Sequence, residues 1–406
     1  MRDRMNNAIS QREDRALRVQ SIEVNHFKSL IDFKFELAHF NCLIGLNGAG
    51  KSTVLQFLDF LSQLVRSQVW LWLEERKWEA TEIRSKLTRK ADVWFRICFA
   101  NDNDESAGYW AATYAPRSQR CSTECFDFPD CRLDVEEKTI TITDKTTNEK
   151  KHLDVVTQYS GSVLSALKPE FIPASIQRCR HFLLRIKSLE LLNPEYLRRR
   201  DRDSMGDLGL GGQKLSAFLH ELDESKKSQL LETLRKAYPQ LQKIHAKSLR
   251  SGWKQLEIHE EFQQTDPGLS PTMITEARHI NDGMLRLMAI LAKLQTTDRF
   301  VLFDEIENGI NPELIEFVVD QLVNANPQVL VTTHSPMILN YLDDETACAG
   351  VTYLYKTRRG HTKAMKFFDI PSMKKKLAVM GPGEAFVDTN LTELAEEISQ
   401  LPGRSV

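Results

Sequence analysis

The chain has 406 residues, of which 41% are hydrophobic and 27% are charged, and its net charge is -2. This hydrophobic content is enough for a large core, and the near-neutral charge excludes a uniformly basic protein that coats nucleic acid. The seven cysteines, the polar start of the chain and the lack of a run of about 20 apolar residues predict a cytoplasmic protein with free thiols, no signal peptide and no membrane span.

The first sixty residues predict the order strand, glycine loop, helix. Residues 1–18 are polar, and we expect them to form an arm outside the core. Apolar residues alternate in Ile22–Val24 and Ile31–Leu37, as in half-buried strands. The apolar run Cys42–Ile44 then precedes a glycine-rich turn directly. Apolar residues recur at helical spacing after the turn, from Val54 to Leu64.

The middle of the chain changes its pattern several times. We predict a charged helical segment over residues 65–90 and a strand over Val93–Phe99, where apolar residues alternate. The polar stretch 101–160 has short strand-like pieces and many turn residues, which predict antiparallel hairpins. Residues 162–247 have a helical pattern. No heptad seam persists through them, so the sequence excludes a long coiled-coil arm.

The last third alternates strands with helices. We predict helices over Met284–Leu294 and Pro312–Val323, and strands over Phe300–Phe303, Val329–Thr332 and Val351–Tyr355. Strands separated by helices of this length favour a mostly parallel sheet. The fold class is therefore α/β.

The glycine-rich turn matches a phosphate-binding loop. Gly45–Ser52 fits the pattern G-x-x-x-x-G-K-S/T, in which glycines let backbone N–H groups surround a phosphate. Lys51 would reach the β- and γ-phosphates, and the Ser52 hydroxyl would bind Mg²⁺. A chance glycine turn is the alternative, but the strand before it and the helix after it argue for nucleotide binding. The residues expected to contact the nucleotide here are Asn47, Gly48, Gly50, Lys51, Ser52 and Thr53.

Two acids follow the apolar strand Phe300–Phe303. Asp304 would bind the Mg²⁺ ion, and Glu305 would polarise the attacking water. A core strand that ends in solvated acids is the alternative interpretation. The presence of a phosphate-binding loop earlier in the chain favours the catalytic one.

A histidine follows the next predicted strand. His334 follows the strand Val329–Thr332, with one threonine between them. It would therefore lie at the carboxyl end of a parallel strand, where ligands of such sheets bind. There it can contact the γ-phosphate or the attacking water. A structural histidine is the alternative, and the order of the elements favours function.

These residues resemble a family, the ABC-type ATPase heads of the SMC/RecF/OLD-like branch, which includes compact ATPases of bacterial antiphage defence. The resemblance runs from Phe27–Leu30 to the last predicted strand, and its most specific part is Asp304–Pro312. It implies an ABC-type P-loop ATPase head, with a mostly parallel core sheet, antiparallel hairpins and an inserted α-helical lid. It also implies ATP and Mg²⁺ as cofactors. Many relatives carry histidine where this chain has Asn311. Lys28 resembles a basic residue near the nucleotide, although a solvated turn lysine is an equal alternative.

The family's signature loop has two candidates. Gly211–Gly212 resembles the transporter form but lies far before Asp304, whereas Asn281 and Gly283 lie one helix and a turn before it. Spacing therefore selects Asn281 and Gly283, although relatives carry serine in place of Asn281. The helix N-terminus there would contact the γ-phosphate of a partner's ATP, which predicts a homodimer with ATP at its interface.

The resemblance also suggests a division of the chain. The expected parts are the arm at 1–18, an N-terminal lobe at 19–165, a helical lid at 166–260, a C-terminal lobe at 261–370 and a tail at 371–406. The glutamine loop of the family has two candidates, Gln158 and Gln177.

Three further features resemble functional sites but also have simpler structural interpretations. Cys121, Cys125 and Cys131 lack the paired spacing of a structural zinc site. The basic runs Arg198–Arg202 and Lys243–Lys254 are candidates for nucleic-acid contact, although charge runs usually form solvated faces. The acids Asp343, Asp344 and Glu345 are interpreted as a loop rather than a nuclease triad.

We therefore predict an ATP-hydrolysing regulatory ATPase that dimerises head to head. In the favoured hypothesis it senses or clamps nucleic acid and controls a separate effector, such as a nuclease, in antiphage defence. A RecF-like DNA repair clamp is the alternative. A transporter ATPase subunit and an ATP-locked scaffold are less favoured, and no membrane partner is expected.

Overall fold

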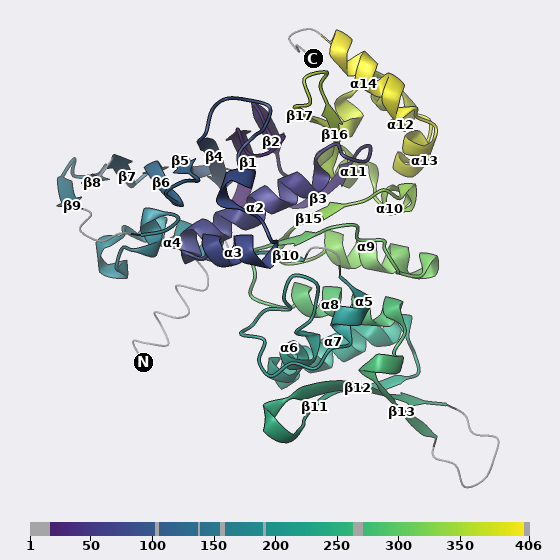
Figure 1. Ribbon diagram of the computed structural model, residues 1–406. Helices are drawn as coiled ribbons and strands as arrows, with labels where there is room; N and C mark the ends of the chain where they lie inside the picture. Colours follow the sequence, from purple (N-terminus) through teal and green to yellow (C-terminus); the bar gives the residue numbers. More distant parts are fainter. Residues whose placement is uncertain are drawn as a thin grey trace. The chain divides into compact units, whose positions relative to one another are not determined.

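The structure is a computed structural model that describes residues 17–101, 105–136, 139–154, 159–189, 192–262 and 271–401 (Figure 1). The chain divides into two compact units. Unit 1 comprises Met1–Lys187, Asp344–Met380 and Asp388–Val406, and unit 2 comprises Ser188–Asp343 and Gly381–Val387. The predicted arm at residues 1–18 falls almost entirely outside the described residues.

Unit 1 contains an eight-stranded sheet, three further strands and several helices. Its strands are β1 (Arg18–Asn25), β2 (Phe33–Glu36), β3 (Phe40–Ile44), β4 (Val93–Ala100), β5 (Ser106–Ala115), β6 (Arg120–Asp127), β7 (Cys131–Glu136), β8 (Thr139–Asp144), β9 (Lys150–Asp154), β16 (Val351–Lys356) and β17 (Thr362–Lys366). Its helices are α2 (Lys51–Arg66), α3 (Val69–Glu75), α4 (Ala174–Leu184), α11 (Asp344–Gly350), α12 (Pro371–Leu377) and α14 (Leu391–Gln400).

The eight-stranded sheet of unit 1 is antiparallel, in the order β2-β1-β4-β5-β6-β7-β8-β9. Each consecutive pair from β4 to β9 is antiparallel, which confirms the antiparallel hairpins predicted within residues 101–160. The alternation in β4 explains why it is a strand: Val93, Phe95, Ile97 and Phe99 are all buried on one face.

An aromatic cluster joins α2 to this sheet. The Phe57 ring packs edge-on against Phe27 at 5.3 Å and against Phe95 at 5.8 Å between ring centroids. Phe95 in turn packs edge-on against Trp110 at 4.9 Å. Each such pair contributes about 1 kcal/mol beyond the area that it buries, so the cluster fixes the helix that follows the glycine loop.

A carboxyl group lies buried in the same sheet. Glu124 on β6 is 3% exposed and accepts hydrogen bonds from the Ser162 hydroxyl and the Val163 N–H, both at 2.6 Å. Burial raises the pKa of Glu124 to about 7, and these hydrogen bonds offset part of the rise. The folded chain therefore keeps this proton at pH values where the unfolded chain has lost it.

This burial predicts a pH-dependent stability. Because the pKa of Glu124 rises from 4.5 to about 7 on folding, its contribution is fully present below pH 4.5 and is lost as the pH rises through 7. Glu124→Gln stays neutral, so the wild type should lose up to about 3 kcal/mol relative to this variant between pH 4.5 and 8. Urea unfolding at both pH values measures the difference. An equal difference at both would contradict the prediction.

The glycine loop follows one of the three further strands of unit 1. The buried strand β3 pairs in parallel with β16, and β16 pairs antiparallel with β17. All five residues of β3 are buried. The chain leaves β3 at Gly45 and enters α2 at Lys51, which confirms the predicted order of strand, loop and helix.

Unit 2 contains the remaining elements, with β10 at its boundary. Its strands are β10 (Ile186–Leu189), β11 (Leu241–Ser248), β12 (Lys254–Glu261), β13 (Thr272–Glu276), β14 (Phe300–Phe303) and β15 (Gln328–Thr332). Its helices are α5 (Pro194–Leu197), α6 (Leu215–Glu221), α7 (Glu224–Ala237), α8 (Asp282–Leu294), α9 (Ile315–Val323), α10 (Pro336–Asn340) and α13 (Pro382–Val387).

The strands β14 and β15 form the parallel core of unit 2. Both are entirely buried, and Phe303 on β14 lies opposite Val331 on β15. The helix α8 precedes β14 and buries ten of its residues. This order of helix and strands confirms the pattern predicted for the last third of the chain.

The structure differs from the sequence analysis in two places. Beyond the end of α2 at Arg66, only α3 is an α-helix in the segment 65–90, and the chain turns at Lys77, whose φ of 55° lies in the left-handed region. The insert predicted as helical contains helices but also an antiparallel sheet of β11, β12 and β13, with α6 and α7 packed on it (Figure 1). The expected tail at 371–406 contains α12, α13 and α14.

No helix among the described residues is long and apolar enough to cross a membrane.

Candidate functional site

The phosphate-binding loop adopts a backbone that requires glycine. Gly45, Gly48 and Gly50 have φ values of 148°, 76° and 111°. A Cβ on Gly45 would lie 2.3 Å from the Leu354 carbonyl oxygen, and one on Gly50 would lie 2.5 Å from Thr362 Oγ1. The loop therefore needs glycine both for its conformation and for its close packing against β16 and β17.

The loop lysine folds back over the loop. Lys51 Nζ donates hydrogen bonds to the Gly45 carbonyl at 2.8 Å and to the Leu46 carbonyl at 3.3 Å, and the residue is 6% exposed. Asn47, Gly48 and Ser52 are exposed. The first turn of α2 thus presents backbone N–H groups and a hydroxyl beside a cation, which is a favourable place for an anion.

Two hydroxyl groups, which contact each other, support this loop through a hydrogen bond to its backbone. The Thr362 hydroxyl donates to the Ala49 carbonyl at 2.9 Å, and its oxygen lies 2.8 Å from the Ser29 hydroxyl. Thr362 on β17 is more than 300 residues from the loop in sequence, and the sequence analysis did not identify it.

Lys28, one residue before Ser29, donates to Gln56 at 2.9 Å and lies 3.2 Å from the centre of the Trp78 ring.

The acid pair in unit 2 is positioned by a threonine of the neighbouring strand. The Thr332 hydroxyl donates to Asp304 Oδ1 at 2.5 Å and accepts from the Glu305 N–H at 2.8 Å. Glu305 has a φ of 49° and accepts a hydrogen bond from the Asn308 side chain. Thr332 thus holds the Asp304 carboxylate and the backbone of Glu305, while Asn308 contacts the Glu305 carboxylate at a strained turn.

The predicted switch histidine lies beyond the adjacent strand β15. His334 is exposed, and its backbone N–H donates to Glu307 Oε1 at 2.8 Å. Glu307 belongs to the turn that begins with the acid pair. Within unit 2, the structure therefore brings Asp304, Glu305 and His334 to the carboxyl ends of two neighbouring parallel strands.

The signature candidate begins α8. The Asn281 side chain accepts a hydrogen bond from the Met284 N–H at 2.8 Å, so it caps the helix. A Cβ on Gly283 would lie 3.1 Å from the Gly309 carbonyl oxygen, which places this glycine against the turn after the acid pair. Arg286, one turn further, donates to the Asn308 carbonyl. Burial lowers the pKa of Arg286, while the charges of Asp282 and Glu305 act in the opposite direction.

Several other candidates have structural partners. Gly211 packs against Tyr196, with a built Cβ only 2.5 Å from that ring, which fits a packed loop better than a nucleotide contact. Gln177 donates to the Pro169 and Ile172 carbonyls, both at 2.7 Å, and Gln158 lies outside the described residues. Asp344 and Glu345 form the first turn of α11. Among the described residues the three spaced cysteines do not converge on a common point.

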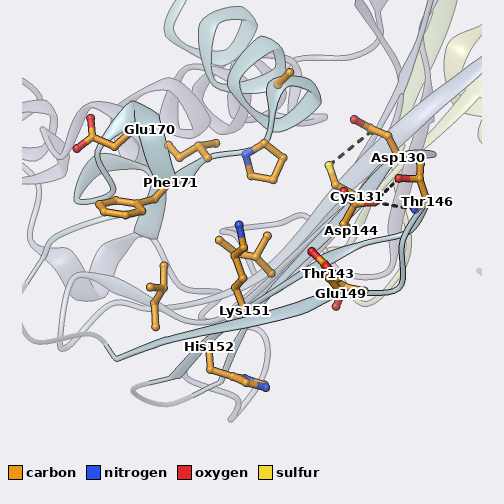
Figure 2. Close-up of a pocket in the computed structure, with 15 residues that line it drawn as sticks. Asp130, Cys131, Thr143, Asp144, Thr146, Glu149, Lys151, His152, Glu170 and Phe171 are labelled. Atoms are coloured by element: carbon orange, nitrogen blue, oxygen red, sulfur yellow. Dashed lines mark hydrogen bonds between the residues drawn. The ribbon is translucent and has the colours of Figure 1, made fainter.

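The predicted residues thus form two groups. The phosphate-binding loop belongs to unit 1, while the acid pair, His334 and the start of α8 belong to unit 2. A cavity of about 890 Å³ lies elsewhere, between β8, β9 and the segment before α4 in unit 1, lined by residues such as Asp130, Lys151 and Phe171 (Figure 2). It contains none of the predicted site residues.

A family model described as "AAA domain, putative AbiEii toxin, Type IV TA system" matches residues 40–340. No curated protein matches the sequence. Among solved structures, an SmcHead bound to the C-winged helix domain of ScpA is 13% identical, with a TM-score of 0.53, over 86% of this chain and 97% of that one.

Two further solved structures are similar over the same share of this chain. The Smc head domain with an extended coiled coil from Pyrococcus furiosus, bound to the C-terminal domain of ScpA, is 12% identical with a TM-score of 0.49 over 96% of its length. The SMC head domain from Thermotoga maritima is 9% identical with a TM-score of 0.42 over 98% of its length. At these identities, the likeness to the SmcHead structure shows the fold alone.

Proposed function

The chain belongs to the AAA-domain family whose model it matches and is an SMC/RecF-like ABC-type ATPase, and from this premise we propose that ATP brings two copies together head to head. The observation that carries the ATP-binding part of the proposal is the phosphate-binding loop at the start of α2. The loop has three glycines with positive φ, and the Lys51 ammonium folds over it. This combination is built to hold a polyphosphate.

The proposed roles follow from the chemistry of each group. The loop N–H groups from Asn47 to Thr53 surround the phosphates, and the Lys51 ammonium leaves the loop carbonyls to contact the β- and γ-phosphates. The Ser52 hydroxyl and the Asp304 carboxylate suit Mg²⁺, which prefers oxygen ligands. Glu305 orients the attacking water. His334 contacts the γ-phosphate or that water.

In this proposal, the second copy contributes the start of its α8 helix to the ATP site. Asn281 and Gly283 are exposed or half-buried at the N-terminus of a 13-residue helix, where backbone N–H groups favour an anion. In the proposed dimer this helix faces the γ-phosphate held by the partner copy. ATP then stabilises the dimer because the γ-phosphate is bound by both copies, and hydrolysis removes that link.

We also propose that nucleic acid binds unit 2. A backbone hydrogen bond of 2.7 Å from Lys254 to Asp201 joins the two basic runs. Two of their arginines stack on exposed aromatic rings: Arg202 on Trp253 at 5.0 Å and Arg199 on Tyr196 at 4.3 Å. Exposed rings beside guanidinium groups suit the bases and backbone of a single strand. Arg198 instead pairs with Asp282.

The binding surface can be tested directly. Arg202→Ala with Trp253→Ala should weaken binding of single-stranded DNA about 10-fold and should lower the salt dependence of binding, because one stacking ring and one phosphate contact are lost. Fluorescence anisotropy over a salt series measures both. Lys236→Ala removes an exposed cation of α7 that belongs to neither basic run, and it is the matched control. Equal affinities for all three chains would refute this part of the proposal.

The biological setting proposed is control of a separate effector, such as a nuclease, in antiphage defence. The family description, which names a putative AbiEii toxin of a type IV TA system, is compatible with such a setting. Co-purification of an effector with the Glu305→Gln chain in the presence of ATP tests it, because this variant should hold the ATP-bound form. A chain that activates DNA repair without an effector would fit the RecF-like alternative.

A further inference from the structure

The three-stranded sheet of unit 2 carries a cluster of nitrogen and oxygen ligands that the ATPase function does not use. His245 on β11 lies directly opposite Glu257 on β12, and His259 is two residues further along β12. Side chains two apart on a strand share a face, as do directly opposed residues, so all three lie on one face. Their ligand atoms lie within 4.8 Å of one another.

The distances fit a single small cation. Glu257 Oε1 lies 3.0 Å from His245 Nδ1 and 3.6 Å from His259 Nε2. Ligands around a tetrahedral zinc ion, at about 2.0–2.2 Å from the metal, are separated by roughly 3.3 Å. Small rotations of two imidazole rings are therefore sufficient to direct all three atoms at one ion.

The surroundings of the carboxylate also favour a site. The Glu257 side chain is 8% exposed, and its second oxygen forms an ion pair with Lys247, which fixes the orientation of the first oxygen toward the histidines. His259 Nε2 is buried and has no hydrogen-bond partner among the described residues. A buried ring nitrogen without a hydrogen bond is costly, and a metal bond would remove that cost.

We propose that His245, Glu257 and His259 bind one zinc ion, which links β11 to β12. Two imidazoles and a carboxylate are ligands that Zn²⁺ accepts, and three protein ligands leave the fourth position to water. The ion closes the hairpin by joining side chains of both strands. It would thus stabilise the sheet independently of ATP.

The test compares zinc binding by the full chain and two variants. Tag-free protein is stripped with a chelator, desalted and titrated with ZnCl₂ by calorimetry. We expect the wild type to bind one more equivalent than the His245→Gln/His259→Gln double variant. Zinc should also raise the Tm of the wild type alone, by roughly 5 °C at a hundredfold excess over Kd. His279→Gln, an exposed histidine of the same unit, is the control and should match the wild type.

Substitution with Co²⁺ distinguishes this site from zinc held by cysteines. Thiolate ligands from any of the seven cysteines give an intense near-ultraviolet band that imidazole and carboxylate ligands do not give, so we expect no such band. Should the double variant fail to fold, His245→Gln alone keeps the Glu257–Lys247 pair and should weaken zinc binding about 10- to 100-fold. A wild type that binds no more zinc than the variants would overturn the proposal, and the three residues would then form only a charged cluster around Glu257.

Discussion

Lys51→Ala should lower the rate of ATP hydrolysis by about 100-fold or more, because it removes the cation that contacts the β- and γ-phosphates. In the structure this ammonium is nearly buried and is held by two carbonyls of its own loop. It therefore starts beside the place where the phosphates bind and needs only to exchange these partners. Phosphate release at saturating ATP and Mg²⁺ measures the rate.

A second lysine of unit 1 provides the control. Lys34 on β2 has a 77% exposed side chain and pairs only weakly with Glu23 across the sheet. Lys34→Ala removes the same charge and should hydrolyse ATP at the wild-type rate. Normal hydrolysis by Lys51→Ala would show that the phosphate-binding loop is not the site of the ATPase reaction.

Glu305→Gln should also lose about 100-fold or more in hydrolysis, but it should keep ATP bound. Glutamine has the shape of glutamate but cannot carry its negative charge, so the attacking water would no longer be polarised. The Thr332 contact to the Glu305 backbone does not depend on the side chain and should remain. ATP should therefore convert this variant to a stable dimer, which light scattering measures as a doubling of mass.

Glu316→Gln is the matched control for this experiment. Glu316 is an exposed residue of α9 in the same unit, so its loss should change neither hydrolysis nor mass. A Glu305→Gln chain that binds ATP and stays monomeric would contradict head-to-head association of the isolated chain.

The elements that were predictable from sequence are those that have a clear apolar pattern within their own residues. β3 and β14 are continuous apolar runs, and α8 has a wide apolar stripe, so each was visible without knowledge of its neighbours. β11 was not visible because its residues are mostly polar. It is a strand because it pairs with β12 and packs under α6 and α7.

The same distinction applies to the candidate site. Residues that carry chemistry, such as Lys51 and Glu305, lie in compact motifs that can be recognised from spacing. Thr332 and Thr362 support those motifs from other strands, and a threonine within a strand has no sequence signal for such a role. Asn281 had a signal that was only partly interpreted, because it also caps α8.

The claim that a second copy completes the ATP site is tested by mixing two inactive chains. Lys51→Ala disables the phosphate-binding loop, and Gly283→Asp places a negative charge at the start of α8, where the partner's γ-phosphate would bind. Each variant alone should be inactive. A mixed dimer pairs the intact loop of the Gly283→Asp chain with the intact start of α8 of the Lys51→Ala chain, which gives one working site of two. Because half of the dimers in an equimolar mixture are mixed, the mixture should regain roughly a quarter of wild-type hydrolysis. A mixture as inactive as its components, from chains that still associate, would contradict the shared site.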